Sequence, residues 1–178
     1  VRSDLPLRRM WAVLTPLPLV VPSYVGAYLM ISVLGPRGLL QHWLEPLGVQ
    51  RLPDIYGFPG AFLALTLLSY PYVFLSTQVA LLRMNPAMEE ASRNLGSGPW
   101  QTFWRVTLPQ LRPGLGAGGM LVTLYVLRDF GAVSLMRYST FTRAIYLQYQ
   151  SSFDRTMAAV LALVLVLITL IILAIDMR

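Results

Sequence analysis

Few residues of this sequence carry side chains that could do covalent or metal chemistry. The 178 residues include one histidine, His42, and neither cysteine nor lysine. A histidine-based triad, a thiolate nucleophile or a zinc cluster therefore lacks the residues that it needs. We expect no catalytic residue, no metal site and no cofactor held by this chain, and we interpret His42 as an ordinary exposed loop residue.

Two short stretches match nucleotide-binding motifs by letter. "GLGAGG", residues 114–119, satisfies G-x-G-x-x-G, but that fingerprint binds dinucleotides only after a strand and within a βαβ unit. Here it follows Pro113 and opens an apolar run, so we expect close helix packing through Gly114-x-x-x-Gly118 instead. "DFG", residues 129–131, lacks the lysine and catalytic loop of a kinase.

Arg128 and Asp129 interrupt an otherwise apolar stretch. If this stretch crosses a membrane, the two charges lie within the bilayer, where a charge is costly unless it is paired or hydrated. Neighbouring residues on a helix point about 100° apart, so the two cannot simply pair with each other. We expect the helix to loosen here, because Gly131 permits a break. Two interpretations stay open: Arg128, Asp129, Gly131 and Ser134 line a translocation pathway, or the charges make structural bonds to neighbouring helices.

The composition indicates that membrane-spanning helices position these residues. The chain is 56% hydrophobic and 12% charged, with uncharged runs of 24, 28 and 20 residues. About 20 apolar residues span a bilayer as a helix. We therefore predict an all-α polytopic transmembrane bundle, a single domain over residues 1–178, with spans at about 11–34, 55–82, 113–136 and 156–175. Pro22 and Pro71 should kink their spans, either for packing or as hinges for gating.

The arginines indicate an orientation. Four spans divide the flanks into two sets, one with eight arginines (Arg2, Arg8, Arg9, Arg83, Arg93, Arg105, Arg112 and Arg178) and one with five (Arg37, Arg51, Arg137, Arg143 and Arg155). Because cytoplasmic flanks carry excess arginine, we expect the N-terminal side and the loop 83–112 in the cytoplasm. The scattered arginines suit membrane lipid rather than nucleic acid as a partner.

The loop 83–112 has the features of two short helices around a bend. Asn85 can cap the first helix, Pro86 suits its first turn and Gly96 can end it in the left-handed conformation. A second helix should start at Pro99 and end at Pro109, with an aromatic side formed by Trp100, Phe103 and Trp104. An interfacial helix or a plain connector would also fit, but a rigid helix pair suits docking into a groove of a partner protein.

The same loop resembles the cytoplasmic signature of binding-protein-dependent ABC importer permeases. That signature runs Glu-Ala-Ala, three residues, Gly, nine residues, Ile, one residue, Leu-Pro. The matching positions of this sequence are Glu90, Ala91, Ser92, Gly96, Val106, Leu108 and Pro109. Ser92 and Val106 depart mildly from the signature in size and shape. Further segments, "YGFPGAFLALTLLSYPYVFL", "DFGAVSLM" and "STFTRAIYLQYQ", are similar to the branch that carries ferric iron, thiamine and polyamines.

The resemblance implies a MetI-like permease core in a bacterial inner membrane, with the loop as the coupling helix of an ATP-driven importer. It implies as partners ABC ATPase subunits that bind ATP and magnesium, a periplasmic solute-binding protein and a second permease half. This piece resembles one half, the first, of a longer permease, and ferric iron is the expected solute. The alternative is a membrane-embedded scaffold or enzyme whose loop docks another partner.

Overall fold

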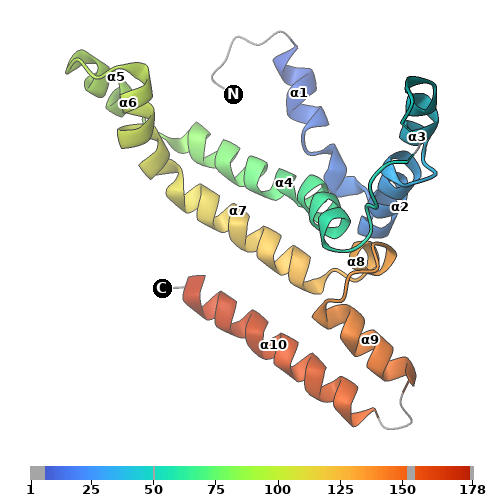
Figure 1. Cartoon of the computed structure of the whole chain (residues 1–178). Helices are drawn as coiled ribbons and strands as arrows, with labels where there is room; N and C mark the ends of the chain where they lie inside the picture. Colours follow the sequence, from blue (N-terminus) through green and yellow to red (C-terminus); the bar gives the residue numbers. More distant parts are fainter. Residues whose placement is uncertain (1–6, 50, 152–154, 177–178) are drawn as a thin grey trace. The chain divides into compact units, whose positions relative to one another are not determined.

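The computed structural model describes residues 7–49, 51–151 and 155–176, and these residues form helices and no strand (Figure 1). Arg2 and Arg178, two of the arginines that define the orientation, lie outside the described residues. The helices in chain order are α1 (Arg8–Leu14), α2 (Ser23–Leu34), α3 (Leu39–Leu44), α4 (Phe58–Arg83), α5 (Ala87–Asn94), α6 (Pro99–Thr102), α7 (Leu108–Arg128), α8 (Gly131–Leu135), α9 (Phe141–Ser151) and α10 (Thr156–Asp176). Short 3-10 turns cover Leu17–Val20 and Glu45–Leu47, and a π-helical turn covers Phe103–Thr107.

Two of these helices are long and apolar enough to cross a membrane, α4 and the Thr156–Ile175 part of α10. A third crossing results if the bent pair Met10–Val20 and Ser23–Leu47 counts as one span. The predicted span 11–34 is therefore broken rather than kinked, because three prolines within seven residues remove the N–H groups that a continuous helix needs. The predicted span 113–136 is divided between α7 and α8, and its crossing of the membrane stays a prediction.

The chain divides into two compact units, and the division crosses α4 next to Pro71, which lies inside the continuous helix. The first unit comprises residues 1–17 and 70–123. Within it α4 and α7 pack along a glycine seam. A Cβ atom on Gly118 would lie 2.6 Å from the Cα of Val73, and one on Gly114 would lie 2.6 Å from the Cβ of Ala80. The predicted small-residue packing of Gly114-x-x-x-Gly118 is confirmed.

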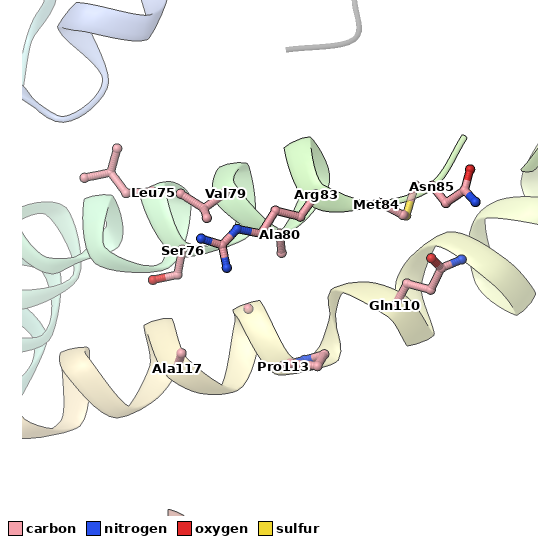
Figure 2. A pocket seen from close by; sticks show the side chains of 11 residues that line it. Leu75, Ser76, Val79, Ala80, Arg83, Met84, Asn85, Gln110, Pro113 and Ala117 are labelled. Carbon is pink, nitrogen blue, oxygen red and sulfur yellow. The ribbon is translucent and has the colours of Figure 1, made fainter. Parts of the chain in front are cut away.

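A cleft of about 870 Å³ lies between α4 and α7, and Ala80 and Gly114 of the seam are among the residues that line it (Figure 2). Its apolar walls include Leu75, Val79 and Ala117, and its polar groups include Arg83 and Gln110. Figure 2 shows the side chain of Arg83 extending back along α4 towards Ser76. The cleft lies at the end of the helix pair that carries the loop 83–112.

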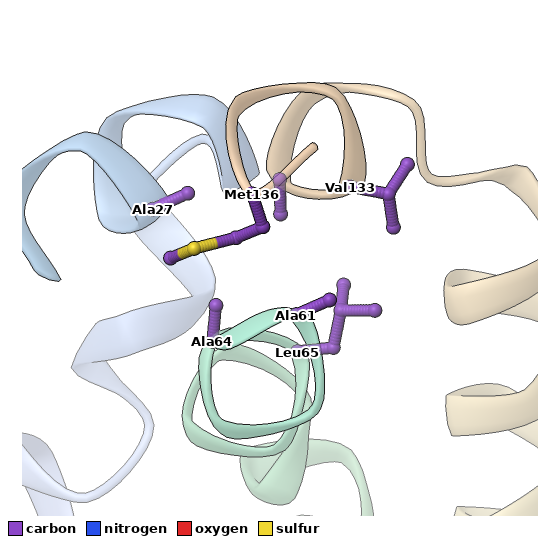
Figure 3. Close-up of a cluster of buried hydrophobic side chains, with 7 residues drawn as sticks. Ala27, Ala61, Ala64, Leu65, Val133 and Met136 are labelled. Carbon is purple, nitrogen blue, oxygen red and sulfur yellow. The ribbon is translucent and has the colours of Figure 1, made fainter. Parts of the chain in front are cut away.

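The second unit comprises residues 18–69 and 124–178. Its core joins α2, the first part of α4 and α8 through mostly small side chains (Figure 3): Ala27, Ala61, Ala64, Leu65, Ala132, Val133 and Met136. Small residues let helix backbones approach closely where lipid supplies no hydrophobic driving force. Helix α10 is packed against α9, and most of its apolar side chains are exposed, as on a lipid-facing helix.

Candidate functional site

The loop between α4 and α7 starts with a capped helix. The Asn85 carboxamide oxygen accepts a hydrogen bond from the backbone N–H of Ala87 at 3.0 Å, and Pro86 stands between them. This bond satisfies one of the N–H groups that the first turn of a helix leaves without a partner. The predicted start of α5 at Asn85-Pro86 is confirmed.

Helix α5 ends in a left-handed turn at Gly96, whose φ is +84°. The Gly96 N–H donates to the carbonyl of Arg93 at 2.9 Å, and the Ser97 N–H donates to the carbonyl of Ser92 at 3.2 Å. These two bonds define a Schellman motif. A Cβ on Gly96 would meet nothing within 4 Å, so the backbone angle, and not lack of space, favours glycine here. This prediction is also confirmed.

The second helix does not end at Pro109, and that prediction is wrong. Helix α6, the π-helical turn Phe103–Thr107 and α7 follow one another without an intervening residue, and Pro109 is the second residue of α7. Proline is tolerated in the first turn of a helix, and the wider π turn changes the hydrogen-bond pattern just before it. The loop therefore continues into the apolar part of α7 as one helical run.

Two side-chain hydrogen bonds connect the two parts of the loop. The Thr107 hydroxyl donates to a carboxylate oxygen of Glu89 at 2.6 Å, and the hydroxyls of Ser92 and Thr102 lie 3.2 Å apart. Thr107 and Thr102 are 7% and 2% exposed, so both bonds are shielded from water on the threonine side. Sequence reasoning placed Glu89 in an i,i+4 pair with Arg93 and missed its bond to Thr107, and it missed Thr102 and Thr107 altogether. The available signal was two threonines on a segment that is rich in aromatic residues.

The aromatic side of the loop faces outward. Trp100, Phe103 and Trp104 are 72%, 38% and 52% exposed, and their ring centroids lie 5.6–6.0 Å apart. Leu95, at 87% exposed, adds to the apolar surface of the loop. An exposed apolar patch of this kind marks a site of contact with protein or membrane. The structure thus brings the three predicted aromatic residues together.

The signature residues divide between surface and contact positions. Glu90, Ala91 and Gly96 are exposed, whereas Ser92 is half-buried against Thr102. The remaining three, Val106, Leu108 and Pro109, are half-buried where the π turn passes into α7. Four arginines of the loop, Arg83, Arg93, Arg105 and Arg112, are exposed. The loop therefore presents a basic and aromatic surface that is suited to a protein partner.

The predicted break near Asp129 is present, since α7 ends at Arg128 and α8 begins at Gly131. Asp129 is 6% exposed, and its carboxylate accepts from the backbone N–H groups of Ala132 at 3.0 Å and Val133 at 3.4 Å. Its carbonyl accepts the Thr142 hydroxyl at 2.6 Å. Asp129 thus caps α8, while Arg128 is exposed, with its guanidinium 5.8 Å from the ring centroid of Tyr125. These contacts favour the structural interpretation of Asp129.

Gly131 and Ser134, the other two residues predicted to line a pathway, lie in packed surroundings. A Cβ on Gly131 would lie 2.9 Å from the hydroxyl of Ser23 and 3.0 Å from the Cβ of Tyr24, so Gly131 allows α8 to approach α2. The Ser134 hydroxyl is buried and has no hydrogen-bond partner among the described residues. No cluster of three or more metal-ligating side chains occurs in the part of the chain that the structure describes. The pathway role of these residues stays a prediction.

Comparison with known proteins decides the family. Residues 2–176 match the model of the binding-protein-dependent transport system inner membrane component. The chain belongs to this family. The loop signature and the all-α fold agree with this assignment, and membership in a family of transport components agrees with the prediction that the chain is not an enzyme.

Relatives within the family bear names for different solutes. The chain is 35% identical over 156 residues to the Fe(3+)-transport system permease protein FbpB 2 of Haemophilus influenzae, covering 88% of this chain and 27% of that protein. It is 31% identical to the sulfate transport system permease protein CysW of Synechocystis sp., covering 96% and 63%. It is 34% identical to the molybdenum transport system permease protein ModB of Escherichia coli, covering 65% and 50%. The chain thus spans only part of the length of these relatives.

Among solved structures, the MetNI methionine ABC transporter in an inward-facing conformation shares the fold. The TM-score is 0.69 at 20% identity, over 97% of this chain and 73% of that one. The predicted MetI-like fold is therefore confirmed. At this identity the similarity concerns the fold alone.

Proposed function

We propose that this chain forms the membrane part of one half of an ABC importer and that its loop 83–112 receives the motion of an ATPase subunit. The observation that carries this proposal is the loop itself. The segment that carries the spaced signature of the family contains a capped helix, a left-handed glycine turn and an exposed aromatic cluster. A connector between two spans needs none of these features, whereas a helix that docks into a groove needs all of them.

In this proposal ATP and magnesium bind to the partner ATPase subunits, and the chain itself holds no cofactor. Closure of two ATPase subunits displaces α5 and α6, and the displacement passes to the helices that the loop joins. A transporter of this kind alternates between inward-facing and outward-facing states around a fixed pathway. A second permease half completes the pathway, and a periplasmic binding protein delivers the solute to the outer side.

The finer proposal concerns the solute, which we propose to be ferric iron. The similarity to a ferric permease at 35% identity supports it, together with the segments that resemble that branch. Relatives named for sulfate and molybdenum transport define the competing solutes. Uptake of radiolabelled iron, sulfate and molybdate, compared between cells with and without the parent gene, separates the three. Loss of sulfate or molybdate uptake, with iron uptake unchanged, would overturn the iron proposal.

The orientation with the loop in the cytoplasm is part of the same proposal. The chain has no cysteine, so single cysteines can be placed at the exposed Leu95 in the loop and the exposed Leu47. Leu95→Cys should react with a membrane-impermeant maleimide only after the inner membrane has also been made permeable, so that the reagent reaches the cytoplasm. Leu47→Cys should react in cells whose outer membrane alone is permeable. The reverse pattern would overturn the orientation.

Purification of the parent protein in mild detergent, followed by mass spectrometry of what accompanies it, tests the importer function. We expect an ATPase with a P-loop to co-purify. Gly96→Val should release it, because a β-branched residue is strained at a φ of +84°. Gly98→Val is the matched control, since Gly98 has an extended backbone with a φ of −65° and open space around it. If no ATPase accompanies the protein while another importer keeps its own, the proposed function is wrong.

A further inference from the structure

The two ends of the loop 83–112 are built differently. Between α4 and α5 the residues Met84, Asn85 and Pro86 are outside the helices. At the other end α6, the π-helical turn Phe103–Thr107 and α7 form a single helical run from Pro99 onward. A continuous helix transmits a displacement along its axis, whereas a non-helical joint absorbs it. The second part of the loop is therefore coupled directly to α7, and α5 is not.

Helix α5 has non-helical residues at both of its ends, 84–86 before it and 95–98 after it. Its backbone alone would let it rotate against the rest of the loop. The bond from the Thr107 hydroxyl to the Glu89 carboxylate connects α5 to the π turn and so opposes this rotation. At 2.6 Å, with an ionised acceptor, it belongs to the short, strong class of hydrogen bonds.

Thr107 lies at the junction between the π turn and α7, so its bond to Glu89 acts at that junction. Thr107 is the last residue of the π turn, and α7 begins at the next residue, Leu108. Mid-helix π turns are places where helices bend and are frequent at functional sites. Pro109 and Pro113 follow closely and remove two further backbone donors. Glu89 therefore holds the helical run at the point where it would bend most easily.

We infer that Glu89 and Thr107 are positioning residues that make α5, the π turn and the start of α7 move as one body. This inference rests on the proposed function, because it concerns the motion that the loop receives. Neither residue belongs to the spaced signature of the family. The pair between Ser92 and Thr102, 3.2 Å apart, supports the same connection one helical turn away.

A merely local role would be that the bond helps the loop to fold. The two roles differ in what the hydroxyl does once the loop has folded. If the role is local, α5 and α7 keep a fixed relation when the bond is lost, because the packing of α5 against α6 and the π turn still holds them. A transmission role predicts that α5 and α7 lose their fixed relation while the ATPase stays bound.

Spin-label distance measurements on the parent protein with its ATPase partner separate the two roles. The chain contains no cysteine, and Met88 on α5 and Leu121 on α7 are 55% and 46% exposed, so labels at Met88→Cys and Leu121→Cys report on both helices. Cysteines elsewhere in the complex are first replaced by serine. The distance between the labels is measured without nucleotide and with ATP and vanadate, which traps the closed ATPase.

We expect one narrow distance distribution that is the same in both states. Thr107→Val should about double its width, because loss of a charge-assisted bond releases positions that the bond excluded. Thr107→Ser keeps the hydroxyl and should restore the narrow distribution. Thr123→Val is the matched control on α7, since the Thr123 hydroxyl is exposed and donates to the carbonyl of Gly119 on the same helix at 2.9 Å.

Three outcomes would overturn the inference. The first is a distance between the labels that changes between the two states in the unsubstituted loop. The second is a distribution that stays narrow in Thr107→Val. The third is a distribution that is as wide in Thr107→Ser as in Thr107→Val. The same preparation shows whether an ATPase accompanies the protein. If it does not, the proposed function is wrong and this inference fails with it; if it does, a failed distance result counts against the inference alone.

Discussion

Two helices of this chain begin with the same device in opposite surroundings. At α5 the exposed Asn85 accepts one backbone N–H, and at α8 the buried Asp129 accepts two. The glycines differ in the same way. Exposed Gly96 is required by its backbone angle, whereas buried Gly118 is required by the nearness of Val73. In the loop the local backbone decides the residue type, and between packed helices the neighbouring element does.

The largest expected effect is at Asp129. Asp129→Ala leaves two buried N–H groups without their acceptor, and we expect a loss of about 2–3 kcal/mol in the free energy of unfolding. The loss should appear as a lower apparent Tm of the purified protein in detergent than that of the unchanged protein, with unfolding followed by tryptophan fluorescence.

Asp129→Asn is the control, because its carboxamide oxygen can still accept from the N–H of Ala132. We expect a nearly unchanged Tm for this variant. Impaired transport with intact assembly in Asp129→Asn would support the pathway role that stays a prediction. A Tm as low as that of Asp129→Ala would mean that the charge, and not the cap, stabilises α8.

The glycine seam should show the next largest effect. Gly118→Ala forces a Cβ to within 2.6 Å of the Val73 backbone, and overpacking of this kind costs about 1–3 kcal/mol. Gly116→Ala lies on the same helix with open space around it and should be neutral or gain up to about 1 kcal/mol. The apparent Tm of the two variants in one detergent decides; equal losses would show that the seam does not restrict position 118.

The exposed cap should matter much less. Asn85→Ala removes the acceptor for the Ala87 N–H, which water can replace, and we expect a loss of about 0.5–1 kcal/mol that is confined to α5. Hydrogen exchange of the α5 amides should become faster, with no change in Tm. Asn85→Asp keeps an acceptor and should exchange as the unchanged protein does. A fall in Tm as large as that of Asp129→Ala would remove the contrast between the two caps.

The same contrast explains what could be predicted from the sequence. Asn85, Pro86 and Gly96 follow local rules for helix ends, so the start and the end of α5 were predictable. The bond between Glu89 and Thr107 joins residues eighteen positions apart, and nothing in their spacing indicates it. The local rule that proline ends a helix fails at Pro109, because the helix continues through the π turn and Pro109 lies in the first turn of α7.

The depth of Asp129 in the predicted span left two interpretations open for a related reason. A charge at Asp129 in an apolar stretch indicates either a pathway or a structural partner, and no local rule separates the two. Only the fold shows that the carboxylate has backbone donors three and four residues ahead. The four apolar stretches were visible in composition, but the break at Pro22 depends on where three prolines leave the backbone without donors.

The aromatic cluster should have a similarly small effect on stability. Trp104 is 52% exposed and contacts the rings of Trp100 and Phe103 edge-on, so Trp104→Ala should cost about 0.5–1 kcal/mol at most. Its effect should instead appear in the amount of ATPase that co-purifies, because exposed aromatic residues contribute most where they enter a partner's pocket. Trp43→Ala removes another exposed tryptophan, 76% exposed and on α3, and as the control it should leave that amount unchanged. A Tm lowered as far as in Asp129→Ala, with the ATPase retained, would mean that the cluster stabilises the fold of the loop and does not contact the partner.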